Sequence, residues 1–193
     1  MTSWTTRSLF AVRRSLGTNA SDYGFRSFAT SRVSQASNAE TKVSDRFGMD
    51  GKSVLITGGA RGMGLGIAKA IAQMGGNVAV LDINEKPEAE FDDFASKYGV
   101  KTVYKRADIT RQDSLEPAFK EIVDELPGLN GLVTAAGICI DKPIGEHGFE
   151  ETKAVQDVNI LGTLWPVKLL ADHLYAQNKP GSIVMIASVA AHG

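Results

Sequence analysis

The residues that decide the fold are Ser53-Val54-Leu55-Ile56-Thr57-Gly58-Gly59-Ala60-Arg61-Gly62-Met63-Gly64. This stretch opens on a short apolar run and then turns to glycine, which predicts a buried strand that enters a tight turn. Apolar residues recur at helical spacing from Leu65 to Ala72, and Gly75-Gly76 follows, so we expect a helix that ends there. A strand, a glycine-rich turn and a helix therefore follow one another directly.

The same alternation continues along the chain. Further strands are expected at 78–81, at 103–104 with an end at Asp108, from 132 to an end at Gly137, and at 182–186. Between them we expect a polar helix over about 86–98, a helix over 115–123 with a capping box of Asp113 and Glu116, and a long helical stretch over about 150–175 that Pro166 kinks or breaks.

The strands are continuously apolar rather than alternating, which favours a parallel sheet with helices on both faces. Right-handed crossovers make a doubly wound topology the simplest arrangement of such a sheet. We therefore predict an α/β fold, a doubly wound parallel sheet of the Rossmann type, truncated after the fifth strand.

Each glycine of the first turn has a physical reason if a dinucleotide binds there. Gly58 permits the tight turn, Gly62 lets the backbone approach a pyrophosphate, and Gly64 allows close packing of helix against strand. The anion would lie against the N–H groups at the start of the helix. Because a strand precedes the glycines and a helix follows them, we interpret this turn as a dinucleotide site rather than a purely structural turn.

Asp82 closes the second expected strand. A carboxylate there accepts hydrogen bonds from a ribose 2′-hydroxyl and repels a 2′-phosphate, which favours NAD over NADP. Arg61 argues the other way, since a guanidinium in the turn can pair with a 2′-phosphate. A helix N-cap is the other role open to Asp82. We predict NAD as the cofactor, with NADP as the less favoured alternative.

These residues resemble the short-chain dehydrogenase/reductase family. Thr57-Gly58-(three residues)-Gly62-Met63-Gly64 is similar to its cofactor motif, and Asp108-Ile109 resembles its adenine-contacting pair after the third strand. Thr134-Ala135-Ala136-Gly137 resembles its Asn-Asn-Ala-Gly segment with both asparagines replaced, so only the close backbone passage at Ala136-Gly137 carries over. The resemblance spans about Met49 to Gly193 and is similar in flavour to sugar and polyol reductases. It implies a cofactor site of Gly58, Arg61, Gly62, Met63, Gly64, Asp82, Asp108, Ile109, Ala136 and Gly137.

The resemblance also implies catalytic residues. Asn159 matches the helix asparagine that helps to hold a proton-relay water, and Ser188 matches the catalytic serine after the fifth strand. The family's general acid/base is the tyrosine of a Tyr-x-x-x-Lys motif beyond that serine, and the sequence ends at Gly193 before such a motif. Tyr175 and Lys179 have this spacing, but they precede the strand that leads to Ser188, so we reject them.

We therefore expect an N-terminal fragment of an NAD(P)-dependent oxidoreductase that interconverts a carbonyl and an alcohol. Its fifth strand would be an unprotected edge, and the fragment by itself would be marginally stable and nearly inactive. Candidate substrates are ketoses, polyols, keto acids and small ketones. The alternative is a dinucleotide-binding short form or partner subunit without turnover.

Residues 1–45 differ in composition from the rest. They hold six basic and three acidic residues, a net charge of +3, and they are crowded with Ser and Thr. Such a segment is typical of a mitochondrial transit peptide, and Arg26-Ser27-Phe28-Ala29 resembles a cleavage motif of the matrix protease. A disordered tail is the alternative. We expect import into the mitochondrial matrix and a folded domain over 46–193.

The composition argues against several other classes. No apolar run reaches the ~18 residues of a membrane-spanning helix, and a net charge of −1 gives no reason to expect nucleic-acid binding. Cys139 is the single cysteine, and His147, His173 and His192 lie far apart, so neither an internal disulfide nor a metal site is expected. The expected partners are a small carbonyl or alcohol substrate and, in a full-length form, further copies of the chain.

Overall fold

The structure, a computed structural model, describes residues 47–188 of the chain. The predicted transit peptide and its cleavage motif lie outside the described residues. The strands are β1 (Ser53–Thr57), β2 (Asn77–Asp82), β3 (Thr102–Arg106), β4 (Leu129–Thr134) and β5 (Ser182–Met185). The main helices are α3 (Gly62–Gln73), α4 (Phe94–Tyr98), α5 (Gln112–Glu125), α6 (Phe149–Gln156) and α7 (Gly162–Ala176). No helix in the described part of the chain is long and apolar enough to cross a membrane.

The five strands form one parallel sheet in the order β3-β2-β1-β4-β5. The chain builds outward from β1 to β3 and then returns to the other side of β1 with β4, which is the doubly wound arrangement that the sequence predicts. The direction in which the chain adds strands to the sheet reverses between β1 and β4, and the loops that diverge there leave from the carboxyl ends of these two strands. In sheets of this kind a ligand binds at that point.

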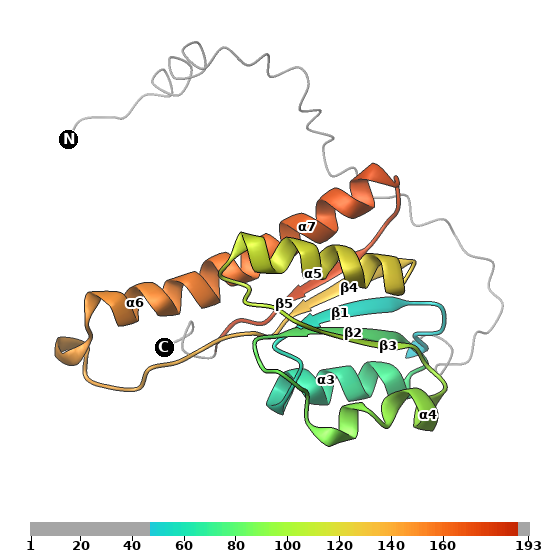
Figure 1. The fold of residues 1–193 in the computed structure, drawn as a ribbon, viewed down its shortest axis with the longest axis horizontal. Coiled ribbons are helices and arrows are strands. Elements are labelled where there is room, and N and C mark those ends of the chain that lie inside the picture. The colour runs from blue at the N-terminus through green and yellow to red at the C-terminus, as the bar shows by residue number, and fades with distance from the viewer. Residues whose placement is uncertain (1–46, 189–193) are drawn as a thin grey trace, which may run out of the picture. The chain divides into compact units, whose positions relative to one another are not determined.

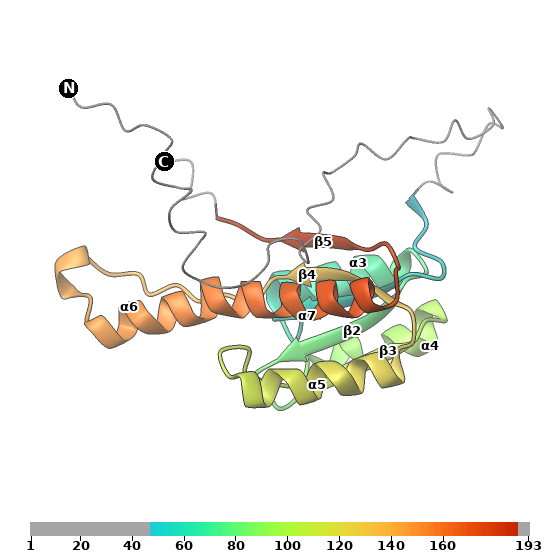
Figure 2. The ribbon, with the colours of Figure 1, turned by 90° about the horizontal axis from the view of Figure 1, so that it is seen from above.

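Helices cover both faces of the sheet, with α3 and α4 on one face and α5 and α7 on the other (Figure 1, Figure 2). Each face has its own apolar core. Val54, Ile56 and Val80 point toward α3 and α4, while Leu55, Leu81 and Leu132 point toward α5 and α7. Successive residues of a strand alternate between the faces, so a continuously apolar strand supplies both cores.

Two predicted helical features are wrong. The polar helix expected over 86–98 is instead a single 3-10 turn, η2 (Ala89–Phe91), and the short α4, because the segment buries only Phe91 and Phe94. The capping box of Asp113 and Glu116 does not form. Arg111 is the N-cap residue of α5 without a side-chain cap, and Asp113 pairs with the Arg111 guanidinium at 2.7 Å.

Two predicted strand ends are also wrong. β3 ends at Arg106 rather than at Asp108, and β4 ends at Thr134 rather than at Gly137. In both cases the sheet pairing stops and the chain turns into the loop at the carboxyl edge. The residues that follow the strands are therefore loop residues at that edge, where a ligand can reach their backbone.

The helical stretch expected over 150–175 is divided by a wide turn. A π-helical segment, η4 (Asp157–Leu161), separates α6 from α7. Pro166 lies inside α7, one turn after η4, so the irregularity precedes the proline rather than coinciding with it. Proline cannot donate to the carbonyl four residues earlier, and the wider turn lies on the amino-terminal side of that missing bond.

Apolar side chains remain exposed along β5 and beside the start of α7. Val184 and Met185 of β5 are more than half exposed, and Leu161, Leu164 and Trp165 form a second exposed apolar group. A groove lined by Val54, Ile71 and Val184, among others, runs beside β5. As the sequence predicts, β5 is an edge strand with no strand on its outer side in the described residues.

We expect Leu55→Ala to lower the free energy of unfolding by about 2–5 kcal/mol, because Leu55 is fully buried at the centre of the sheet and the variant leaves a cavity. Urea denaturation of the chain measures this loss. Ile144→Ala is the matched control, since Ile144 is 89% exposed and its truncation should change the same quantity by less than about 0.5 kcal/mol. Equal losses in the two variants would contradict the described core.

Candidate dinucleotide-binding site

The glycine-rich turn after β1 brings three backbone segments into direct contact. Gly58 has φ +69°, and a Cβ atom there would lie 2.5 Å from Cα of Ala136 in the loop after β4. A Cβ atom on Gly64 would overlap the carbonyl oxygen of Gly58. No side chain larger than hydrogen fits at either position, so the turn, the first turn of α3 and the loop after β4 pack backbone to backbone.

Gly62 serves a different purpose. It has φ +57°, a backbone conformation that residues other than glycine rarely adopt. A Cβ atom there would meet nothing within 4 Å. The space beside Gly62 is therefore open, and it lies where α3 begins. The first N–H groups of a helix have no partners within the helix, so this opening suits an anion.

A cavity of about 340 Å³ lies over the carboxyl ends of β1, β2 and β4. All of the residues that the sequence predicts for the cofactor line this one cavity: Gly58, Arg61, Gly62, Met63, Gly64, Asp82, Asp108, Ile109, Ala136 and Gly137. They come from four separate loops of the chain. The fold thus assembles the predicted set at the switch point of the sheet.

Seven further residues that were not predicted also line the cavity: Leu81, Ile83, Asn84, Ala107, Ala135, Ile138 and Val158. Six of them directly adjoin a predicted residue or its immediate neighbour along the chain, so their position beside the predicted residues could have suggested them. Val158 comes from the π-helical segment η4. No residue pattern distinguishes that segment from an ordinary helix.

Asp82 joins two loops of the cavity through its carboxylate. Oδ2 accepts a hydrogen bond from the backbone N–H of Ala60 at 2.9 Å, and Oδ1 accepts one from the N–H of Asn84 at 3.0 Å. The side chain thereby ties the glycine-rich turn to the loop after β2. Each carboxylate oxygen has two acceptor sites, so both can still accept a hydrogen bond from a ligand hydroxyl.

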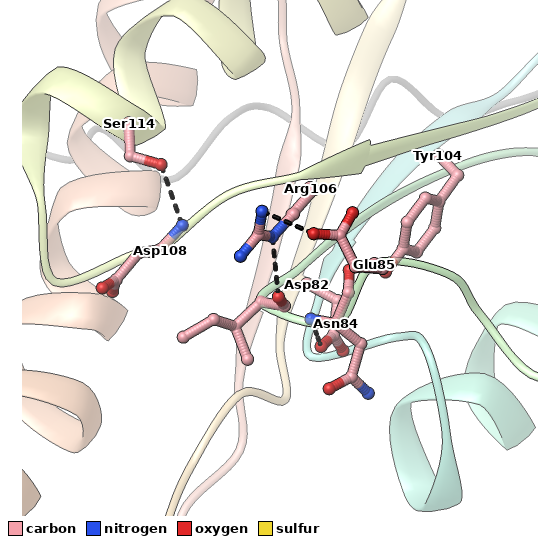
Figure 3. A network of polar contacts seen from close by, with 8 residues as sticks. Asp82, Asn84, Glu85, Tyr104, Arg106, Asp108 and Ser114 are labelled. Atoms are coloured by element: carbon pink, nitrogen blue, oxygen red, sulfur yellow. Dashed lines mark hydrogen bonds and ion pairs between the residues drawn. The ribbon is translucent and has the colours of Figure 1, made fainter.

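The loop after β2 is held from its other side by β3 (Figure 3). The Tyr104 hydroxyl donates to the carbonyl of Asn84 at 2.7 Å, and Arg106 Nε donates to the carbonyl of Ile83 at 3.2 Å. Arg106 also forms an ion pair with Glu85 at 2.7 Å. Burial, and then the nearby Asp82 and Glu85 charges, raise the pKa of Tyr104 to about 12, so it remains a donor at neutral pH.

The loop after β3 is fixed in a similar way. The backbone N–H of Asp108 donates to the Ser114 hydroxyl at 2.9 Å, and Asp108 Oδ1 accepts hydrogen bonds from the N–H and hydroxyl of Thr110. Ser114 lies in the first turn of α5, so this bond sets the loop against that helix. Asp108 and Ile109 are held at the rim of the cavity.

Asn159 holds the loop after β4. Its side-chain oxygen accepts a hydrogen bond from the N–H of Ile138 at 2.9 Å, and its side-chain nitrogen donates to the carbonyl of Ile138 at 2.9 Å. Asn159 does not itself line the cavity, but Ile138 does. Its side chain is engaged with the backbone rather than with solvent.

Hydrogen bonding is incomplete around the two positions where asparagine is replaced. Thr134 stands at the end of β4, where the resembled motif has asparagine, and its buried hydroxyl has no hydrogen-bond partner among the described residues. Ala136 N–H donates to the Thr57 hydroxyl at the long distance of 3.4 Å. The backbone passage past Gly58 is therefore retained without the side-chain contacts of the motif.

The remaining predicted residues lie apart from the cavity. Ser188 is an exposed residue three positions beyond β5, at the carboxyl edge of the sheet, and it does not line the cavity. Tyr175 is exposed in the last turn of α7. Gly181 lies close to Leu174 and to the backbone of Asn130 near the start of β4, since a Cβ atom on it would overlap both. The end of α7, with Tyr175 and Lys179, is therefore at the opposite edge of the sheet from the cavity.

The arrangement fits an extended, anionic ligand with a sugar hydroxyl at one end. The open space beside Gly62 and the start of α3 suit a pyrophosphate, and the Asp82 carboxylate suits a ribose hydroxyl. Ala107, Asp108 and Ile109 form a wall on the far side. These residues would hold the adenosine and pyrophosphate portions of a dinucleotide.

Comparisons with known proteins agree with this geometry. The family model for short chain dehydrogenases matches residues 52–193. A diacetyl reductase, (S)-acetoin forming, from Staphylococcus epidermidis is 32% identical over 141 residues, which cover 73% of this chain and 55% of the relative. An NADP-dependent mannitol dehydrogenase from Aureobasidium melanogenum is 29% identical over 155 residues, covering 78% of this chain and 58% of the relative.

The solved structures show the same fold. The crystal structure of a short-chain type dehydrogenase/reductase from Mycobacterium marinum superposes with a TM-score of 0.75 at 29% identity, covering 79% of this chain and 62% of that one. The chain thus spans little more than half the length of the relatives that it matches.

We expect Gly64→Ala to abolish measurable dinucleotide binding and to lower the melting temperature, because the new methyl group overlaps the Gly58 carbonyl. Gly66→Ala is the matched control on the same helix, where a Cβ atom meets nothing within 4 Å. That variant should bind unchanged and gain about 0.5–1 kcal/mol of stability from the better helix former. Thermal unfolding and NADH fluorescence titration measure both, and equal behaviour of the two variants would refute the close contact.

Proposed function

Because the chain belongs to the short-chain dehydrogenase/reductase family, we propose that the whole protein interconverts a carbonyl and an alcohol with a nicotinamide dinucleotide as cofactor. The observation that carries the proposal is the single cavity at the switch point, lined by the glycine-rich turn, Asp82, Asp108 and the Ala136-Gly137 passage. When the dinucleotide is bound, its nicotinamide ring would supply the hydride or accept it. Because the chain spans little more than half of its relatives, the activity is proposed for the whole protein.

The residues of this chain would bind and orient the cofactor. The turn around Gly62 would receive the pyrophosphate, and Asp82 would accept hydrogen bonds from the adenosine ribose. Asn159 would keep the loop at Ile138 in place through its two backbone hydrogen bonds. Ser188 would hold the substrate oxygen in the role that the family gives to its serine.

We propose NAD rather than NADP as the preferred cofactor. Asp82 is held in place by two backbone hydrogen bonds, so its charge cannot swing away from a 2′-phosphate. The Arg61 guanidinium lines the same cavity and favours a 2′-phosphate, but its long side chain is exposed and free to move. The related mannitol dehydrogenase is NADP-dependent, so the preference is proposed from Asp82 and not from that relative.

The substrate class that we propose is a small polyol, ketose or hydroxyketone. The related proteins from Staphylococcus epidermidis and Aureobasidium melanogenum are a diacetyl reductase and a mannitol dehydrogenase, both of which act on small oxygen-rich molecules according to their names. The described cavity is formed by the cofactor-binding loops. The selection of one substrate within this class therefore depends on residues outside the cavity.

A second function is favoured by one specific observation. The only Tyr-x-x-x-Lys sequence in the chain is Tyr175 to Lys179, at the edge of the sheet away from the cavity. This pair is too far from the cavity to act on a ligand there, so the alternative that we propose is dinucleotide binding by residues 1–193 without turnover. Robust carbonyl reduction by purified residues 1–193 would exclude this alternative, whereas NADH binding without reduction would support it.

We further propose that residues 1–45 direct the protein to the mitochondrial matrix, on the strength of their basic, Ser-rich and acid-poor composition. Incubation of the labelled chain with isolated mitochondria tests this proposal. Protease-protected product that is shortened near Ala29 would support it, and a product that stays outside and uncut would refute it.

We expect residues 1–193 to bind NADH more tightly than NADPH, and Asp82→Ala to reverse or remove this preference. Loss of hydrogen bonds to a charged acceptor costs about 1.5–3 kcal/mol, so the Kd for NADH should rise by about tenfold or more, while the Kd for NADPH should rise far less because a repulsion is also lost.

Fluorescence titration with the two cofactors gives both Kd values. Asp92→Ala, which removes an exposed acid between η2 and α4, is the control and should leave both unchanged. An equal effect of Asp82→Ala on the two cofactors would contradict the proposed role of Asp82.

A further inference from the structure

The end of β3 places a second cation beside the proposed ribose site. Arg106 is the register partner of Asp82 in the parallel pairing of β2 with β3. Paired residues of adjacent parallel strands project from the same face of the sheet, about 5 Å apart. Arg106 Nε donates to the carbonyl of Ile83, which itself lines the cavity. The Arg106 guanidinium is therefore close enough for its charge to act on a ligand at Asp82.

This cation is engaged by Glu85. Figure 3 shows the two side chains turned toward each other, and Arg106 Nη1 lies 2.7 Å from Glu85 Oε1. The side chains are 59% and 75% exposed. Exposed ion pairs of this kind are weak, so Glu85 lowers the affinity of this guanidinium for a dianionic phosphate by a modest factor, and its removal would restore that affinity.

Two cations and two anions surround the ribose end, and Asp108 adds a third carboxylate to the same cavity. Arg61 and Arg106 are positive, and Asp82 and Glu85 are negative. Arg61 has no ion-pair partner among the described residues. Removal of Glu85 would make the net charge of this group more positive by one, next to the position that a 2′-phosphate would occupy.

We propose that Glu85 is a second cofactor-specificity residue: by pairing with Arg106 it withholds that guanidinium from the 2′-phosphate of NADP. The proposal rests on the proposed function, in that it assumes a dinucleotide whose ribose lies at Asp82. Glu85 acts through Arg106 and touches no cofactor itself, so it is a positioning residue. Asp82 would repel the phosphate directly, and Glu85 would neutralise the nearest group able to attract it.

The surroundings support an electrostatic role rather than a purely structural one. The loop after β2 is already fixed by Tyr104 and by Asp82, which bond to Asn84 on its two sides. Arg106 Nε also bonds to Ile83 independently of Glu85. The conformation of the loop therefore does not depend on the ion pair, whereas the charge available to a ligand does.

The test is a comparison of NADH and NADPH affinities in residues 1–193 and its variants. Glu85→Gln keeps the size of the side chain and removes its charge. We expect the Kd for NADPH to fall by about three- to tenfold and the Kd for NADH to change by less than twofold, in line with the weak energy of exposed pairs. The gain should vanish in 1 M salt, where charges are screened beyond ~3 Å.

The double variant Glu85→Gln/Arg106→Gln shows whether the effect passes through Arg106. It should return the Kd ratio of the two cofactors to within twofold of the unaltered chain. Asp172→Asn is the control. It removes an exposed acid that is likewise paired with a cation, and it lies in the second half of α7, which leads away from the cavity. This variant should change neither Kd. Glu85→Ala provides a second route to the same loss of charge.

Equal changes for both cofactors, an unchanged ratio, or a gain that persists in the double variant would overturn the role of Glu85 while leaving the proposed function intact. A failure of the unaltered, folded chain to bind either cofactor would overturn the proposed cofactor site in these residues, and this inference with it. Melting temperatures of all variants, which should agree within a few degrees, separate these outcomes from a loss of folding.

Discussion

The site depends on one steric constraint, the backbone contact among Gly58, Gly64 and Ala136. A Cβ atom at either glycine would collide with backbone atoms, so the turn after β1, the start of α3 and the loop after β4 can meet only where side chains are absent. This contact brings the amino terminus of a helix directly over the switch point of the sheet. The cavity, its anion-binding end and the position of Asp82 all follow from that approach.

The rim of the cavity is held by side chains that bond to the backbone of a neighbouring loop. Asp82 holds Ala60 and Asn84, Ser114 holds Asp108, and Asn159 holds Ile138. In each case a single polar residue fixes a loop that has no regular structure of its own. A site built in this way is ordered before the ligand arrives, which lowers the conformational entropy lost on binding.

The sheet could be predicted from sequence because β1, β2 and β5 contain continuous apolar runs, and the glycine spacing around Gly62 identified the turn. Local polar chemistry was less informative. Asp113 has the spacing of a capping residue, but the adjacent Arg111 guanidinium binds it instead. The side chains of Tyr104 and Arg106 bond to loop residues that lie 20 and 23 positions earlier, and such pairings depend on the sheet register. The π-helical segment has no distinct residue pattern over only five residues.

That segment also sets the direction in which two parts of one long helical region face. Each residue of a regular helix advances the side chains by about 100°, and a π turn accommodates one residue more than an α turn. The wide turn thus absorbs one residue, and if the same residues formed a regular α-helix, α6 would be rotated around the axis of α7 by about that angle. Asn159 and Leu170 could then no longer face Ile138 and the core at once. The wide turn therefore keeps the two ends of this helical region on their separate partners.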